Sequence, residues 1–129
     1  MKAYGLVFFW LLAIRLTAQE QAVIRWESTA HDFGKVVQGK KVEHTFKFVN
    51  IGTASLIITN VEVSCGCTTP KGWPRDPIKP GDRGEIVVAF NSTSKYGLQH
   101  KMITVVSNAI NQEARQLTFT AEVVPVPDP

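Results

Sequence analysis

Cysteine is scarce in this chain, which has two, Cys65 and Cys67, among 129 residues. A small secreted scaffold held together by disulfides carries a denser set of cysteines, so we expect an ordinary hydrophobic core here. A tetrahedral zinc site would need more ligands than this pair supplies. The three histidines, His31, His44 and His100, are scattered along the sequence and do not extend the pair by any recognisable spacing.

Excess basic charge is also missing once the N-terminal segment is set aside. Removing residues 1–18 takes away Lys2 and Arg15, two of the 14 basic side chains, and leaves 12 against 11 acidic ones, a formal charge of about +1. No cluster of Lys and Arg remains to neutralise a row of phosphates, so we expect no nucleic-acid partner. The run from Gly39 to Lys41 is interpreted as a hairpin turn that carries solvated lysines.

The first 18 residues have the layout of a secretory signal peptide. Lys2 provides a short positive region, an apolar run extends from Leu6 to Ile14, and Ala18 precedes a polar stretch. The apolar run is too short to span a bilayer. We therefore expect cleavage of residues 1–18, an exported protein in the periplasm or outside the cell, and no membrane insertion after the signal is removed.

The rest of the chain alternates apolar and polar residues with the period of a half-buried strand. In the segments 42–48 and 85–90 the positions expected to face inward are Val42, His44, Phe46, Phe48, Ile86, Val88 and Phe90. Five similar runs bring the expected number to about seven strands, which is typical of an immunoglobulin-like β-sandwich. We predict an all-β fold, one domain over residues 19–124, and a proline-rich tail over residues 125–129.

Glycine and proline separate these runs. The segment 50–54 is interpreted as a hairpin turn, and the segment 79–82 as a type II turn with Pro80 and Gly81 at its centre. Four prolines, Pro70, Pro74, Pro77 and Pro80, fall within residues 68–82. They predict an irregular crossover between the two sheets, in which Pro70 ends any strand ladder.

Five short motifs occur in a fixed order along the chain. They are Asp32-Phe33-Gly34, the F-x-F-x-N-x-G run over 46–52, the S-C-G-C-T run over 64–68, the Pro80-Gly81 turn and the I-T-V-x-S-N run over 103–108. In this order they resemble the bacterial exported proteins grouped as domain-of-unknown-function family 1573. That family is similar to the immunoglobulin-like domains of major sperm protein and Hydin, so the resemblance implies a seven-stranded sandwich and no established chemistry.

Three interpretations of the Cys65-Gly66-Cys67 segment stay open. In an oxidising compartment the thiols form a disulfide, for which Gly66 must bend the backbone because cysteines two residues apart on an extended strand lie near the upper limit of bridging. As thiolates they suit Cu(I), or zinc with further ligands, or thiol-redox work. As packed thiols at a sheet edge they have no chemical role.

Other candidate residues are few. Trp73, on the proline-rich segment, is either a lid over one end of the core or a contact for a partner. His44 is in phase with the inward phenylalanines, so a hydrogen-bonded inward histidine is favoured over a ligand. Asp32-Phe33-Gly34 is interpreted as a turn into a strand, with Phe33 in the core.

No catalytic constellation can be argued from these residues. Neither thiol has a base that is oriented by a third group, and no carboxylate pair or nucleophile motif occurs, so we expect no enzyme and no cofactor. We expect a non-enzymatic module that binds an unknown protein partner through a sheet face, an edge strand or a loop end that carries both Cys65 and Trp73. The alternative is a metal or thiol-redox protein that uses Cys65 and Cys67.

Overall fold

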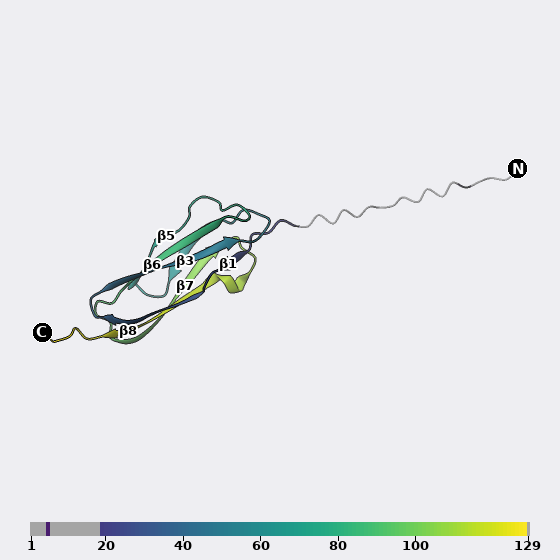
Figure 1. Cartoon of the computed structure of the whole chain (residues 1–129). Coiled ribbons are helices and arrows are strands. Elements are labelled where there is room, and N and C mark those ends of the chain that lie inside the picture. The colour runs from purple at the N-terminus through teal and green to yellow at the C-terminus, as the bar shows by residue number, and fades with distance from the viewer. Residues whose placement is uncertain (1–4, 6–18, 129) are drawn as a thin grey trace.

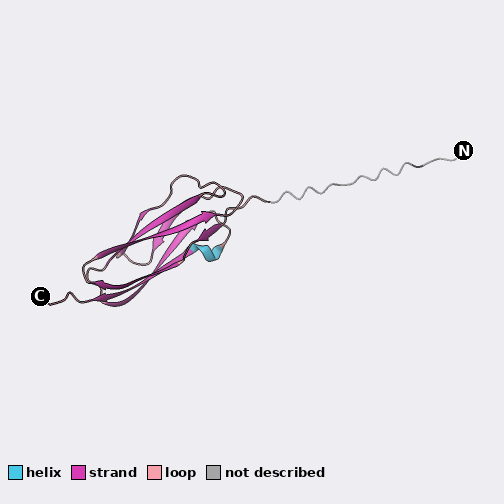
Figure 2. Ribbon diagram, in the orientation of Figure 1, coloured by secondary structure: helices cyan, strands magenta, loops and turns pink. Residues whose placement is uncertain are grey.

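The computed structural model describes Gly5 and residues 19–128, so apart from Gly5 the predicted signal peptide lies outside the described residues. Eight strands form two four-stranded sheets that pack face to face (Figure 1, Figure 2). Sheet A has the order β1 (Ile24–Trp26), β3 (Lys41–Asn50), β6 (Arg83–Asn91) and β5 (Thr68–Gly72). Sheet B has the order β2 (Ala30–Val37), β8 (Gln116–Val124), β7 (Gly97–Ser107) and β4 (Ile58–Val63).

The two sheets form an immunoglobulin-like sandwich, as the sequence predicted, with eight strands where about seven were expected. The chain enters sheet A as β1, which is antiparallel to β3, and then changes to sheet B as β2, which is parallel to β8. Within the described part of the chain the single helical segment is the 3-10 turn η1 (Gln112–Arg115), and no helix there has the length and apolar character needed to cross a membrane. Residues 125–128 follow β8 as an exposed tail outside any strand.

The core lies between the two sheets and contains the inward positions expected from the alternation. Phe46 pairs with Ile86 across β3 and β6, so the two side chains lie on the same inner face. From this face Phe90 contacts Phe119 of sheet B, with ring centroids 5.3 Å apart. The largest fully buried side chains come from both sheets: Phe46, Phe48, Phe90, Phe119, Leu56, Ile86, Ile103 and Leu117.

Both predicted hairpins are wrong, although each segment does reverse the chain. Residues 38–40 connect β2 to β3, and residues 51–57 connect β3 to β4, and in each case the two strands belong to different sheets. The turn residues are therefore where the sequence indicated, but the strands on either side do not pair. Turn chemistry specifies a local change of direction and does not select the strand's partner.

The proline-rich segment was predicted to be irregular throughout, and its first five residues are instead the strand β5. Pro70 lies opposite Val88 of β6, so it does not end the ladder; the pairing continues to Gly72 with a register irregularity. Proline is tolerated here because β5 is the edge of sheet A, where one side of the strand has no neighbour to receive an N–H. The type II turn is confirmed, since Gly81 has φ +86° and Asp82 N–H donates to Lys79 O at 3.0 Å.

Asn50 and Gly52 of the F-x-F-x-N-x-G motif over 46–52 both have structural roles. Asn50 is completely buried, and its amide donates to the carbonyl oxygens of Ala54 and Ile78, both at 2.9 Å. Its Oδ1 accepts from Gly52 N–H at 3.0 Å. A Cβ on Gly52 would lie 2.2 Å from the carbonyl oxygen of Gln21, so only glycine fits at this close approach of two backbone segments.

The Asp32-Phe33-Gly34 motif is a bulge inside β2 and not the predicted turn before it. Asp32 Oδ1 accepts from Gly34 N–H at 2.8 Å, Gly34 has φ +67°, and the register with β8 shifts between Asp32 and Lys35. The extra length keeps Phe33 against the core, where its ring centroid lies 5.3 Å from that of Phe119. Glycine in the left-handed region is the usual device for such a bulge.

Candidate functional site

The cysteine segment lies where the chain leaves sheet B at the end of β4 and crosses to sheet A to begin β5. The structure joins Cys65 and Cys67 by a disulfide, with Cα atoms 5.3 Å apart, within the range that a bridge allows. Cys67 N–H donates to Cys65 Sγ at 3.1 Å, and Thr68 N–H donates to Cys65 O at 3.1 Å. The bridge therefore closes a single tight turn.

Glycine is not required in this turn, contrary to the sequence-based argument. A Cβ on Gly66 would meet no described atom within 4 Å, and its φ is outside the left-handed region that excludes other residues. Thr68 is buried, and its hydroxyl lies 4.0 Å and 3.9 Å from the two sulfur atoms. The two sulfur atoms and this hydroxyl form a small half-buried cluster at the crossing between the sheets.

Trp73 lies at the other end of β5 from the disulfide. It packs against the core and stays partly exposed, and the guanidinium of Arg75 lies 3.7 Å from its ring centroid. The five residues of β5 place it about 17 Å from the cysteines at the usual rise of a strand. The structure thus places Cys65 and Trp73 on two separate surfaces, so a single loop end that carries both is wrong.

Trp73→Phe should leave the free energy of unfolding within about 1 kcal/mol of wild type, or raise it. The indole Nε1 is buried, and no acceptor for it occurs among the described residues. Phenylalanine keeps the ring on the core and removes this unsatisfied donor. Urea denaturation measures the change, and Trp73→Ala is the control that should lose clearly more because it removes the ring itself.

A pair of histidines connects β2 of sheet B with β3 of sheet A. The rings of His31 and His44 are stacked, with centroids 3.6 Å apart, and Phe33 and Phe46 lie edge-on against them. His44 thus points inward, as expected, but it is held by ring stacking. Among the described residues no group of three or more His, Cys, Asp or Glu side chains could hold a metal ion.

Acid should destabilise the protein partly through His44. Burial lowers the pKa of His44 below its ordinary value of 6.5, and the charge of the neighbouring His31 lowers it further. The unfolded chain therefore binds a proton at His44 more readily than the folded chain does. The contribution of neutral His44 to the free energy of unfolding is present above pH 6.5 and is lost as the pH falls through the lowered pKa. Urea midpoints at pH 7.5 and pH 5 should differ less in His44→Gln than in wild type, and equal differences would contradict the assignment.

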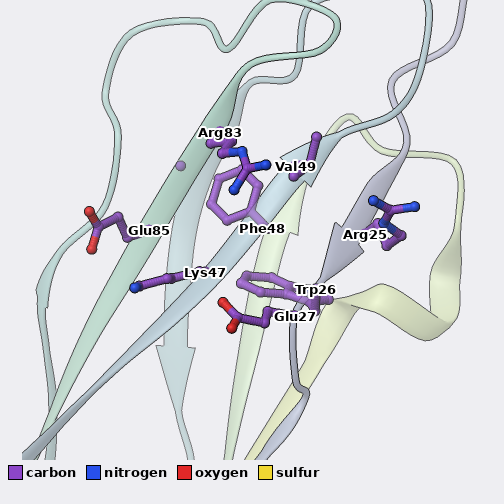
Figure 3. A pocket seen from close by; sticks show the side chains of 9 residues that line it. Arg25, Trp26, Glu27, Lys47, Phe48, Val49, Arg83 and Glu85 are labelled. Carbon is purple, nitrogen blue, oxygen red and sulfur yellow. The ribbon is translucent and has the colours of Figure 1, made fainter.

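A hollow of about 480 Å³ lies over β1, β3 and β6 of sheet A (Figure 3). Charged side chains of both signs surround it, with Trp26 and Phe48 at its base (Figure 3). The charged residues are Arg25, Glu27, Lys47, Arg83 and Glu85. Sequence reasoning missed this groove because its residues come from three strands whose adjacency no local pattern reveals. None of them is a nucleophile of the serine, threonine or cysteine type.

A second surface feature is a row of exposed apolar side chains at the beginning of β7, interrupted between Leu98 and Met102 by the exposed His100. Tyr96 is 71% exposed, Leu98 79% and Met102 38%. Leu98 and Met102 lie on the outer face of sheet B, since the alternate residues of β7, such as Ile103, are buried. Hydrogen bonds between Ser64 and Met102 connect the row to the segment that carries the cysteines.

Comparison with known proteins agrees with this architecture. A family model described as "Protein of unknown function (DUF1573)" matches residues 24–123. No curated protein matches the chain. A protein of unknown function from Porphyromonas gingivalis W83 has a similar structure, with a TM-score of 0.71 and 22% identity over 84% of this chain and 50% of that one. This chain therefore spans about half the length of that neighbour.

A human domain has the same fold without sequence similarity. The ASH/PapD-like domain 7 of human CEP192 aligns with a TM-score of 0.61 and 10% identity over 98% of this chain and 99% of that one. At this identity the similarity concerns the fold alone. It supports the immunoglobulin-like, PapD-like sandwich and assigns no site residue.

Proposed function

Because the chain belongs to DUF1573, a family of proteins of unknown function, we propose its activity from the surface that it exposes: it is a non-enzymatic, exported module that binds another protein. The observation that carries this proposal is the apolar row of Tyr96, Leu98 and Met102, which are 71%, 79% and 38% exposed. Neighbouring large apolar side chains left in water mark surfaces that a partner covers.

Two further features support the proposal. The groove on sheet A is lined by charged and apolar residues, none of which is a serine, threonine or cysteine nucleophile, and this lining favours binding over covalent catalysis. Export is supported by the signal-peptide pattern of residues 1–18 and by the pairing of Cys65 with Cys67, since disulfides persist outside the cytoplasm.

Site-specific photo-crosslinking in the native compartment tests the proposal. A photoreactive residue at Leu98 should give one defined protein adduct, because this side chain is the most exposed member of the row. The same residue at Gln116, which is exposed at the other end of sheet B, should give none. No adduct at Leu98, or the same adducts at both positions, would contradict a protein-binding function for this surface.

The alternative function is a metal or thiol-redox protein that uses Cys65 and Cys67. Its structural support is the Cys67 N–H that points at Cys65 Sγ, since such a donor also stabilises a thiolate after reduction. Protein purified from its native compartment should contain the disulfide and no stoichiometric metal if binding is the function. About one equivalent of Cu(I) or zinc that disappears in the Cys65→Ser/Cys67→Ser variant would establish the alternative instead.

A further inference from the structure

Half of β7 has a neighbouring strand on one side only. β7 extends from Gly97 to Ser107 and pairs with β8 from Gly97 to Thr104. β4 covers its other side only from Ser107 to Ile103, and one further contact follows, in which Ser64 N–H donates to Met102 O. The chain then turns away through the disulfide toward sheet A. Residues 97–101 of β7 therefore form an edge beside which no described strand lies, and we call this segment the open edge.

The backbone groups that face the open edge follow from the contacts of Met102. Its carbonyl accepts from Ser64 N–H and its N–H donates to Ser64 Oγ, so its backbone points toward the β4 side. Backbone groups two residues apart on a strand point the same way. The N–H and C=O groups of Leu98 and His100 therefore point into the open edge, where no described residue pairs with them.

The outer edges of the other edge strands carry features that oppose a further strand. At β1 the side chain of Asn111 occupies the backbone of Ile24, accepting from its N–H at 3.1 Å and donating to its carbonyl at 2.7 Å. β5 contains Pro70, β2 has its bulge between Asp32 and Lys35, and the β4 ladder is irregular after Ile58. The uncovered beginning of β3 exposes Lys41 and Glu43. Proline, bulges and charges are the usual devices that prevent edge pairing. The open edge of β7 contains neither a proline nor a bulge.

In the open edge an apolar side chain faces outward and a charged side chain faces inward, which is the reverse of the pattern in a normal core strand. Leu98 points outward and is 79% exposed, while Lys101 points inward, in phase with the buried Ile103. The single ion pair of the described residues joins Lys71 to Glu43, so neither Lys95 nor Lys101 has a carboxylate partner there. An inward lysine opposes pairing with an apolar strand, but a strand that carries a carboxylate at this position would neutralise it.

A second copy of the chain fits the same edge poorly in the register centred on Leu98. Two open edges paired antiparallel about Leu98 would place Lys95 of one copy opposite Lys101 of the other. Directly opposed like charges destabilise a strand pair. The charge of the edge therefore favours a different protein with acidic side chains.

We propose that β7 binds an extended segment of a partner protein by strand addition at the open edge, and that this segment alternates apolar and acidic side chains. Its backbone pairs with Leu98 and His100, its apolar side chains cover the exposed row, and a carboxylate binds Lys101. This inference rests on the proposed protein-binding function and specifies the class of partner. Main-chain hydrogen bonds supply affinity in such complexes, and alternate side chains supply specificity.

Two short peptides test the proposal with the whole protein. The probes are a fluorescent, end-capped octapeptide of alternating valine and glutamate and its counterpart of alternating valine and lysine, and fluorescence anisotropy measures their binding. The glutamate peptide should bind at least about tenfold more tightly, because its charge complements Lys101. Methylating the backbone nitrogens of its four central residues should abolish binding, which tests strand pairing without changing the protein.

Two variants locate the site. Leu98→Pro removes an N–H that points into the open edge and leaves the ladder with β8 intact, so it should weaken binding of the glutamate peptide by about tenfold. Leu98→Ala keeps the N–H and is the matched control, which should lose less. Lys101→Glu should reverse the preference between the two peptides. If Leu98→Pro fails to fold, the methylated peptide and Lys101→Glu still decide the question.

Each failure has a distinct meaning. If neither peptide binds, or methylation and Lys101→Glu change nothing, strand addition is wrong, and the proposed function stands as long as Leu98 crosslinks to a partner. If Leu98 gives no adduct as well, both are wrong. Dimerisation in analytical ultracentrifugation that Leu98→Pro abolishes would assign the open edge to a second copy and overturn the acidic-partner proposal.

Discussion

Gly52→Ala should destabilise the sandwich by about 3 kcal/mol or more, because the added methyl group has no space. Its carbon would lie 2.2 Å from Gln21 O and 2.6 Å from Val23 N, and both are backbone atoms that cannot rotate away. The segment before β1 would have to move off the loop after β3, which would also disturb the buried Asn50 and its bond to Gly52 N–H. Urea denaturation followed by circular dichroism measures the loss.

Gly66→Ala is the matched control within the same protein. Its methyl group would meet no described atom within 4 Å, and the backbone there is not left-handed. We expect a change within about 0.5 kcal/mol, the usual size for an unconstrained surface position. Equal losses of unfolding free energy at the two glycines would show that the close backbone approach at Gly52 does not restrict this position to glycine. A large loss at Gly66 alone would mean that the disulfide turn depends on glycine after all.

Phe46→Ala should cost about 3 to 5 kcal/mol, the usual range for truncating a buried phenylalanine. Phe46 is 1% exposed at the centre of β3, and its ring also packs edge-on against His44. The cavity would lie between two rigid sheets, whose backbone hydrogen bonds prevent them from closing around it. The free energy of unfolding from urea titration gives the loss directly.

Lys47→Ala provides the control for that measurement. Lys47 follows Phe46 on the same strand, but it points to solvent, so its removal should cost about 0.5 kcal/mol or less. Comparable losses at the two positions would show that the inward phase of β3 has been assigned to the wrong face. Because side chains on a strand alternate between faces, the comparison tests the phase independently of the total stability.

Local patterns predicted most of the strands because strand periodicity is a property of the backbone itself. Phe46, Phe48, Ile86 and Phe90 are at most 2% exposed, as their alternation indicated. The type II turn at Gly81 was equally predictable, since it depends on four adjacent residues. The five motifs indicated a resemblance to family 1573, and the family model that matches residues 24–123 confirms it.

The strands that were missed or shortened are those whose residues contradict the pattern. β5 contains Pro70, which is acceptable only because tertiary packing places this strand at an edge. The beginning of β7 departs from the core pattern, because Leu98 faces water and Lys101 faces inward. Local rules fail most often where a surface serves a function, which is consistent with the role that we propose for the open edge.

The candidate sites were predicted less completely than the fold. The proximity of Cys65 and Cys67 is evident from their spacing, and the disulfide in the structure needs only one turn. The stack of His31 on His44 joins residues of two sheets, and the groove on sheet A joins residues of three strands. Such contacts depend on which strands become neighbours, and the alternation within one strand carries no information about its neighbour.

The sequence by itself therefore determined the all-β class, the inward face of most strands, the positions of several chain reversals and the proximity of the two cysteines. The tertiary structure alone decided which sheet each strand joins, where the edges are, and that Cys65 and Trp73 lie at opposite ends of β5. The physical reason is that alternation and turn preference act between adjacent residues. Strand pairing is a competition among distant segments for the same hydrogen-bonding groups and the same apolar surface, and only the folded chain resolves it.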